Sequence, residues 1–480
     1  MRKAKIFSTG FMVILMVLVM VVSPALAQKE YKITFPELEA YKKFYDDPRP
    51  LWKDFDVKKV IPPGDYAKMV FDLEKMKNRW AEAVGFRSPD IVGKIAPEIK
   101  PGTYSYKDKE KYPGLKELMI PDLYNNWFKA GGPPHGGCFP EIKVVPTRQY
   151  YMALPISEAT VKNKGTAKLT DQGYLIPRSY IAGYPFPQPS GKFKPQEVIY
   201  NWEKRFFGGD TFYGYGYFQG MTKNLANDSL MIAEKYTLRL QARVLVEPYG
   251  WYDKRADTQG ETLAVSLNFL APRDMIGSAT SKLQYMDPDK LDSMLMYLGS
   301  MRRIRKMTST DTQDSIAGQD AIYDDDQGFS QKLTPKLYPY KYEIMDEREY
   351  LVPTYSIDGG AYFTSKEKEY RNVEFERRPL YVVKLTQLDP NYVYSKRIIY
   401  IDKETFILLY IENFDRKGRL YRSAYSFSLF RPEMGLFMEY DVVFRDLVDL
   451  HTTLGRAAML PVTWLGREHV DLGGMVTKGK

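Results

Sequence analysis

The residues of this chain best able to do chemistry are three histidines and a single cysteine, and their spacing argues against a catalytic or metal site. His135, His451 and His469 lie far apart and match no metal-ligand spacing, so we expect each to be a surface or hydrogen-bonded histidine. Cys138 follows His135 closely in a Gly/Pro-rich loop, and the two could form a thiol nucleophile and its base. No nucleophile motif surrounds them, so the sequence favours a partly buried free thiol.

Carboxylates are concentrated in a short segment that contains Asp320, Asp324, Asp325 and Asp326. Oxygen ligands of this kind suit Ca²⁺. Their spacing does not match the register of a known calcium loop, and acidic loops are usually exposed to water. We therefore expect a solvated loop, with no metal and no cofactor. No phosphate-binding glycine loop is present in the sequence.

Three antiparallel strands in Lys396–Phe430 are the clearest structural signal. The runs Ile398–Ile401 and Phe406–Ile411 are apolar on both faces, whereas the strand from Tyr421 to Leu429 alternates. An antiparallel sheet usually leaves one face to water. Strands that are apolar on both faces therefore need a cover on the second face: a helix, more sheet or an apolar ligand.

Other segments extend this sheet, and helices interrupt the runs of strands. Helices are expected near residues 65–84, at Glu197–Phe206, and between Asp287 and Gly299, where Asp287 is a cap and Pro288 opens the first turn. Further strands are expected at residues 142–145, 212–218, 236–246, 263–270, 300–307, 338–352, 380–388 and 436–444. This order predicts an α+β meander and not βαβ units.

The N-terminus reads as a secretory signal peptide. Basic residues precede the apolar run Phe11–Val22, and Ala25-Leu26-Ala27 is a small-x-small cleavage site, which predicts cleavage after Ala27. The apolar run is short for a membrane anchor, which needs about 20 residues. Cys138 lies far from the cleavage site, so a lipidated N-terminal cysteine is excluded. We expect a periplasmic protein, either free or peripheral to the outer membrane.

Charge and composition narrow the function classes further. The formal net charge is +9 for 480 residues, and it falls to +6 without the three basic residues of the signal peptide. This charge is mild and spread along the chain, so a nucleic-acid partner is not expected. The chain has 38 Tyr and 25 Phe. Such aromatics most often fill a β-rich core, and alternatively they line an apolar pocket.

Four regions follow from these signals. Residues 1–27 are the signal peptide, and residues 28–195 form an N-terminal arm and a Pro/Gly-rich extended region with the helix near 65–84. Residues 196–450 form the sheet domain, and residues 451–480 form a C-terminal tail.

Three blocks of sequence carry a family resemblance: Gly183–Gly208, Tyr297–Phe329 and Arg397–Arg422. The last two resemble successive blocks of secreted proteins related to the lipoprotein carriers LolA and LolB. The first resembles a narrower proteobacterial family catalogued as domain of unknown function 1329, often labelled outer-membrane lipoprotein-sorting protein. Together the blocks span roughly Val92–Phe444 in order.

The resemblance implies a large, curved antiparallel sheet, an incomplete barrel of the LolA/LolB type with helices covering its concave face. In the lipoprotein carriers this cup holds acyl chains. The resemblance implies two classes of possible partner: exporters of the resistance-nodulation-division type and outer-membrane proteins. This chain is longer than LolA or LolB and has a long N-terminal extension, so a hydrophobic cargo other than a lipoprotein is favoured.

Three functions remain open on the sequence. The first is a non-catalytic periplasmic binding or carrier protein for a hydrophobic or lipid-like molecule, the second a structural adaptor on an envelope complex, and the third a hydrolase of unknown type. For the carrier, candidate lining residues are the helix and strand aromatics and the doubly apolar strands: Trp202, Phe206, Tyr213, Tyr215, Tyr217, Ile399, Ile401, Ile407, Leu409 and Ile411. Each of these residues could equally be ordinary core.

Overall fold

The computed structural model describes residues 61, 63–133, 135–308, 311–354, 361–364 and 366–472. The predicted signal peptide, its cleavage site after Ala27 and the arm up to residue 60 lie outside these residues. The chain divides into two units, Met1–Ile33 and Thr34–Lys480, and all described residues belong to the second. Among the described residues, no helix is both long enough and apolar enough to cross a membrane.

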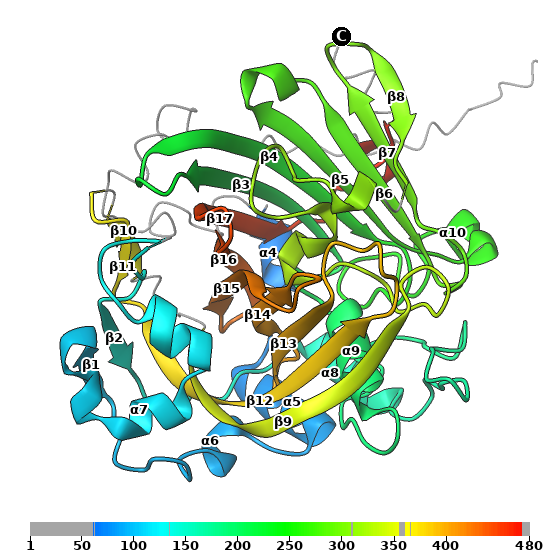
Figure 1. The fold of residues 1–480 in the computed structure, drawn as a ribbon. Coiled ribbons are helices and arrows are strands. Elements are labelled where there is room, and N and C mark those ends of the chain that lie inside the picture. Colours follow the sequence, from blue (N-terminus) through cyan, green and yellow to red (C-terminus); the bar gives the residue numbers. More distant parts are fainter. Residues whose placement is uncertain are drawn as a thin grey trace, which may run out of the picture. The chain divides into compact units, whose positions relative to one another are not determined.

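A single large sheet dominates the part of the chain that the structure describes (Figure 1). It has 15 strands in the spatial order β1-β2-β12-β13-β14-β15-β16-β17-β3-β4-β5-β6-β7-β8, with β9 on the other side of β12. The strands are β1 (Gly102–Ser105), β2 (Glu141–Val144), β3 (Thr211–Met221), β4 (Asn227–Arg239), β5 (Glu261–Ala271), β6 (Ala279–Tyr285), β7 (Ser293–Leu298), β8 (Arg303–Lys306), β9 (Tyr340–Pro353), β12 (Glu374–Gln387), β13 (Lys396–Asp402), β14 (Leu408–Phe414), β15 (Leu420–Arg431), β16 (Leu436–Asp446) and β17 (His451–Pro461).

The sheet is antiparallel except where β12 meets β2, and it is open. The path runs from β1 to β8, and β9 lies off it beside β12. Among the described residues, no pairing joins β8 to β1 or to β9. The predicted α+β fold with an incomplete antiparallel barrel is therefore confirmed. A separate hairpin, β10 (Tyr362–Thr364) with β11 (Glu369–Arg371), lies outside the large sheet.

The helices are short and lie before or between the runs of strands. They are α4 (Pro63–Lys68), α5 (Leu73–Val84), α6 (Ser88–Ile91), α7 (Pro113–Leu118), α8 (Leu154–Lys162), α9 (Lys194–Glu203) and α10 (Lys254–Gln259). Two helices thus replace the one expected near 65–84. Helix α5 begins after Asp72, whose carboxylate accepts a hydrogen bond from the Lys75 backbone N–H at 2.8 Å, and it ends at Gly85 with a φ of 89°.

Three sequence-based predictions of secondary structure are wrong, at least in part. The strand expected at residues 236–246 corresponds only to the end of β4, which stops at Arg239. Residues 287–299 do not form a helix: Ser293–Leu298 is β7, which pairs with β6 and β8. The Asp287 side chain caps only a turn, by accepting a hydrogen bond from the Asp289 backbone N–H. Residues 451–480 are not only a tail, because His451–Pro461 is β17 and pairs with both β16 and β3. Strand β17 therefore joins β3, from the early part of the sheet, to β16, from its late part.

Both faces of the strands around β15 are covered by other parts of the chain. On one face, Trp127 and Phe139 of the N-terminal extension pack on the Tyr425 ring, with centroids 4.9 Å apart in each case. On the opposite face, a segment from residue 311 to 331 lies inside the curve of the sheet, where Figure 1 draws it in yellow-green. It contains two short 3₁₀ turns, η4 (Asp311–Gln313) and η5 (Tyr323–Gly328). We call this segment the plug.

Helix α9 joins the plug on this inner side. The indole Nε1 of Trp202 donates a hydrogen bond to the Phe329 carbonyl at 2.8 Å. The doubly apolar strands are therefore explained by two covers: the N-terminal extension on the outside, and α9 with the plug on the inside.

Candidate functional site

Two adjoining cavities lie between the inner face of the sheet and the plug. One is apolar and has a volume of about 100 Å³. The other has a volume of about 150 Å³, and we call it the polar cavity because eight charged side chains line it. They share the lining residues Phe207, Lys235, Leu267, Ile316, Asp326 and Gln327. A ligand that filled one cavity would therefore reach the border of the other.

The apolar cavity is built on β3, β4, β16 and β17, whose side chains alternate between the two faces of the sheet. Strand pairing aligns Phe218 with Met231 and Gly455, and it aligns Gly216 with Ala233 and Ala457, in rows on the inner face. The remaining contributors include residues of β5, β14, β16 and the plug: Leu267, Ile316, Leu408, Ile411, Val442 and Phe444.

Small residues create the space in this cavity. A Cβ atom at Gly216 would lie 2.6 Å from the Phe218 ring, and one at Gly455 would overlap the same ring. The Phe218 side chain therefore lies flat over two glycine backbones. Ala233 and Ala457 leave further room beside it. Larger side chains at these positions would fill the cavity.

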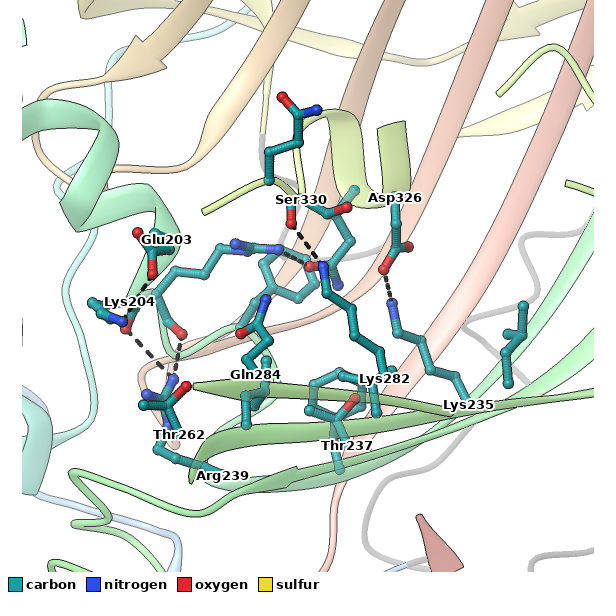
Figure 2. A pocket seen from close by; sticks show the side chains of 18 of the residues that line it. Glu203, Lys204, Lys235, Thr237, Arg239, Thr262, Lys282, Gln284, Asp326 and Ser330 are labelled. Carbon is teal, nitrogen blue, oxygen red and sulfur yellow. Dashed lines mark hydrogen bonds and ion pairs between the residues drawn. The ribbon is translucent and has the colours of Figure 1, made fainter. Parts of the chain in front are cut away.

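The polar cavity lies over β4, β5 and β6 and is closed from above by the end of α9 and by the plug (Figure 2). Thr237 pairs with Val265, and Val265 pairs with Lys282, which places these three side chains in one row on the inner face. Lys235 and Lys282 both reach up from the strands toward the plug (Figure 2). The Lys235 ammonium meets the Asp326 carboxylate at 2.6 Å, and the Lys282 ammonium donates to the Ser330 carbonyl at 2.9 Å.

Burial and neighbouring charges shift the pKa values of two ionisable groups in this cavity. Burial would raise the pKa of Asp326, but the Lys235 ammonium and more distant cations lower it below its ordinary value. Burial lowers the pKa of Arg205 to about 10, because the cationic form loses hydration there. The cavity therefore holds charged groups that are only partly exposed to water, where an opposite charge would be attracted.

The aspartates of the plug are not a solvated loop, contrary to the sequence-based prediction. Asp324 and Asp325 are buried, and the sheet side supplies their partners. Tyr392 donates its hydroxyl to Asp324 at 2.8 Å, and Tyr394 donates to Asp325 at 2.8 Å. The buried Arg397 guanidinium pairs with Asp325 at 2.5 Å. These aspartates fasten the plug to the sheet.

A second fastening holds the other end of the plug. The Asp320 carboxylate accepts a hydrogen bond from the Thr453 hydroxyl at 2.7 Å and lies 2.7 Å from Nδ1 of His451. Nε2 of His451 lies 3.0 Å from a carboxylate oxygen of Asp228. Hydrogen bonding to Asp320 raises the pKa of His451 to about 9, so the imidazole is cationic at neutral pH.

The predicted thiol is completely buried. Cys138 is 0% exposed, whereas His135 is exposed. Burial raises the pKa of the Cys138 thiol to about 12, which leaves almost no thiolate at neutral pH. The geometry therefore gives no activated cysteine. Among the described residues, no group of three or more His, Cys, Asp or Glu side chains is arranged to hold a metal ion.

The structure places four of the ten predicted lining residues in the wall of the apolar cavity: Trp202, Tyr215, Ile407 and Ile411. The other six are Phe206, Tyr213, Tyr217, Ile399, Ile401 and Leu409, and all of them are buried. Phe206 packs under the Arg239 guanidinium at 4.0 Å, and the hydroxyl of Tyr217 bonds to Gln219. Contact of any of the ten with a ligand stays a prediction.

Sequence reasoning missed the polar side of the site. The segment around β4 alternates between Tyr236 and Leu238 on one face and Thr237 and Arg239 on the other. Such polar positions normally face water, yet Thr237 and Arg239 are buried and face the polar cavity. The available signal was the run of long basic side chains on the polar faces of neighbouring strands, Lys235, Arg239 and Lys282.

Comparison with known proteins identifies the family. A family model described as "Protein of unknown function (DUF1329)" matches residues 138–461, which is more than half of the chain. No match is found among curated proteins.

Several solved structures are similar to this chain at low identity. A DUF1329 family protein from Desulfovibrio piger is 13% identical, with a TM-score of 0.39, over 56% of this chain and 92% of that one. A putative outer membrane lipoprotein-sorting protein domain from Vibrio parahaemolyticus is 14% identical, with a TM-score of 0.39, over 57% and 93%. A LolA superfamily protein from Nitrosomonas europaea is 12% identical, with a TM-score of 0.35, over 58% and 97%.

Proposed function

Because this chain belongs to the DUF1329 family, a family of proteins of unknown function, we propose its role from the cavity that it builds. The protein is a non-catalytic binding or carrier protein for a hydrophobic or lipid-like molecule. The observation that carries this proposal is the apolar cavity between the inner face of the sheet and the plug.

The lining of this cavity suits binding better than catalysis. Its walls are mostly aliphatic and aromatic side chains, and among the described lining residues of both cavities there is no Cys and no His. Transfer of a ligand methylene from water into such a wall contributes about 0.8 kcal/mol. A short stretch of hydrocarbon therefore supplies useful affinity with few polar contacts.

The cavity also has a way to open. The plug is held to the sheet by polar contacts at Asp320, Asp325 and Asp326, while its apolar residues, such as Ile316, border the cavity. Release of these contacts would expose the cavity without unfolding the sheet. A carrier needs such a route for loading and delivery.

The site of action follows from the predicted signal peptide. We place the mature protein, beginning after Ala27, in the periplasm or against the outer membrane. An exporter of the resistance-nodulation-division type or an outer-membrane protein is the proposed partner for transfer of the cargo. These assignments rest on the sequence and its resemblance to the lipoprotein carriers.

A pair of matched variants tests the carrier function. Ala233→Leu adds three carbon atoms on the cavity side of β4, at a residue that is 2% exposed. Ala264→Leu makes the same change at a residue that is 4% exposed on β5 and belongs to neither cavity. Binding is followed with N-phenyl-1-naphthylamine, an uncharged probe that fluoresces in apolar surroundings.

We expect the wild type and Ala264→Leu to bind the probe and Ala233→Leu to lose at least tenfold in affinity. Circular dichroism of each variant shows that the fold is retained. Equal probe binding by both variants would move the binding site away from this cavity. No binding by any folded form would overturn the carrier function.

A further inference from the structure

The polar cavity has more positive than negative charge in its wall. Its described lining residues include five cations and three carboxylates: Lys204, Arg205, Lys235, Arg239 and Lys282 against Glu203, Asp210 and Asp326. Two of the three carboxylates have close cationic partners, Glu203 with Lys204 at 2.8 Å and Asp326 with Lys235 at 2.6 Å. The excess charge therefore lies on the remaining cations.

Arg205 is the clearest case. Its guanidinium donates to the Trp202 carbonyl at 2.9 Å and to the side-chain oxygen of Gln327, and it stacks 3.8 Å above the Trp202 ring. It makes no ion pair with a carboxylate of the described residues, and its Nε atom is buried without a hydrogen-bond partner. Arg205 is partly withdrawn from water, and a partly desolvated cation without a counter-charge is costly, so a binding partner of opposite charge would stabilise it.

Arg239 is only weakly compensated. Its nearest carboxylate oxygen, on Asp210, is 3.7 Å from Nε, and that Nε atom is also buried without a hydrogen bond. The other oxygen of Asp210 is occupied by the backbone N–H groups of Val244, Leu245 and Val246. Beside Arg239 the buried hydroxyl of Thr237 also lacks a partner.

The two cavities together have the form of an amphipathic site. The apolar cavity has a mostly hydrocarbon wall, and the polar cavity next to it presents unpaired donors and net positive charge. We infer that the polar cavity binds the anionic head group of an amphiphile whose hydrocarbon chain occupies the apolar cavity. This inference rests on the proposed carrier function and names the class of its cargo.

Carboxylate and phosphate head groups share the chemistry that this site recognises. An arginine guanidinium presents planar N–H donors that match the oxygen atoms of either group. The Lys282 ammonium adds a point charge from β6. It donates a hydrogen bond to the neutral Ser330 carbonyl at 2.9 Å, and its nearest carboxylate, on Asp292, is 4.0 Å away. The head group would take the place of the missing counter-charge.

Competition experiments separate the head group from the chain. Octanoate, octyl phosphate and octanol carry a short hydrocarbon chain of matched length with a carboxylate, a phosphate or an uncharged hydroxyl. Each is titrated below its micelle concentration against N-phenyl-1-naphthylamine bound to the full mature protein. Inorganic phosphate alone is the fourth competitor. We expect at least one anionic amphiphile to bind at least tenfold more tightly than octanol, because a hydrogen bond to a charged group changes affinity about 10- to 100-fold.

Variants assign that preference to this cavity. Arg205→Gln should abolish most of the preference for the anion and leave the affinity for octanol within twofold. Lys282→Gln provides a second test on another element, in case Arg205→Gln does not fold. Arg79→Gln, at an exposed arginine of α5 that lines neither cavity, is the matched control.

Each outcome decides one question. Equal affinity for charged and uncharged chains, or a preference that both cavity variants retain, would overturn the head-group assignment and leave the carrier function standing. Displacement by inorganic phosphate alone would identify a phosphate site and overturn the amphiphile. Failure of all of the chains and of the probe to bind would overturn the carrier function itself.

Discussion

Replacement of the buried Arg397 side chain tests whether contacts between the plug and the sheet stabilise the fold. The Arg397 side chain is 0% exposed and the Asp325 side chain is 2% exposed, and they pair at 2.5 Å. The same guanidinium donates to the Asn413 side chain and to the Tyr392 hydroxyl, each at 3.0 Å. One cation thus joins β13, β14 and the plug.

The cost of losing this cation follows from what it leaves behind. In Arg397→Met the Asp325 carboxylate stays buried and keeps only uncharged donors, including the Tyr394 hydroxyl. Breaking one side of a buried ion pair in this way costs about 3–5 kcal/mol of unfolding free energy. Replacing both charges costs much less, because no charge is left unpaired. We therefore expect Arg397→Met with Asp325→Asn to recover about 2 kcal/mol of that loss.

The wild type, the two single variants and the double variant form a double-mutant cycle, and urea unfolding measures the stability of each. Tryptophan fluorescence reports the global transition, and hydrogen exchange reports protection of the plug residues separately. If Arg397→Met costs less than about 1 kcal/mol, or if the two changes are simply additive, the pair does not hold the plug in place.

Three further predictions test other parts of the structure. Hydrogen bonding to Asp320 raises the pKa of His451 to about 9, above the value near 6.5 expected in the unfolded chain. The wild type should therefore lose about 1–2 kcal/mol of stability as the pH rises from about 6.5 to 9, after allowance for partial exposure, and thermal unfolding of His451→Gln should lack this decline. Cys138 should resist iodoacetamide in the folded protein and react only at the rate of unfolding, and fast stoichiometric labelling would contradict its burial. Gly455→Ala should cost about 1–3 kcal/mol in urea unfolding and weaken probe binding, because the new methyl group overlaps the Phe218 ring; an unchanged variant would show that this ring can move freely.

Much of the sheet could be predicted because its strands carry local signals. The alternation in Tyr421–Leu429 and the paired apolar runs before it correspond to β15, β14 and β13. Helix-capping signals were less reliable. Asp287 and Pro288 predict a helix, but residues 293–298 form a strand that pairs with β6 on one side and β8 on the other. Cap chemistry is local, whereas strand pairing depends on residues distant in sequence.

The site was harder to predict than the fold, for two physical reasons. A strand pattern gives two faces but not which of them is buried, so Thr237 and Arg239 look like a water-facing edge although they line the polar cavity. An acidic run also looks solvated until its partners are known. Asp324 and Asp325 find theirs at Tyr392, Tyr394 and Arg397, which are about 70 residues away in the chain and adjacent only after folding.

Native mass spectrometry of the mature protein, purified from a periplasm without detergent and then extracted with organic solvent, tests the central claim most directly. The account predicts a bound hydrophobic molecule at close to one per chain, bearing a carboxylate or phosphate, and predicts that Ala233→Leu carries much less of it than Ala264→Leu does. A wild-type protein that is purified without a bound molecule and also fails to bind the uncharged probe would contradict a carrier function for this cavity.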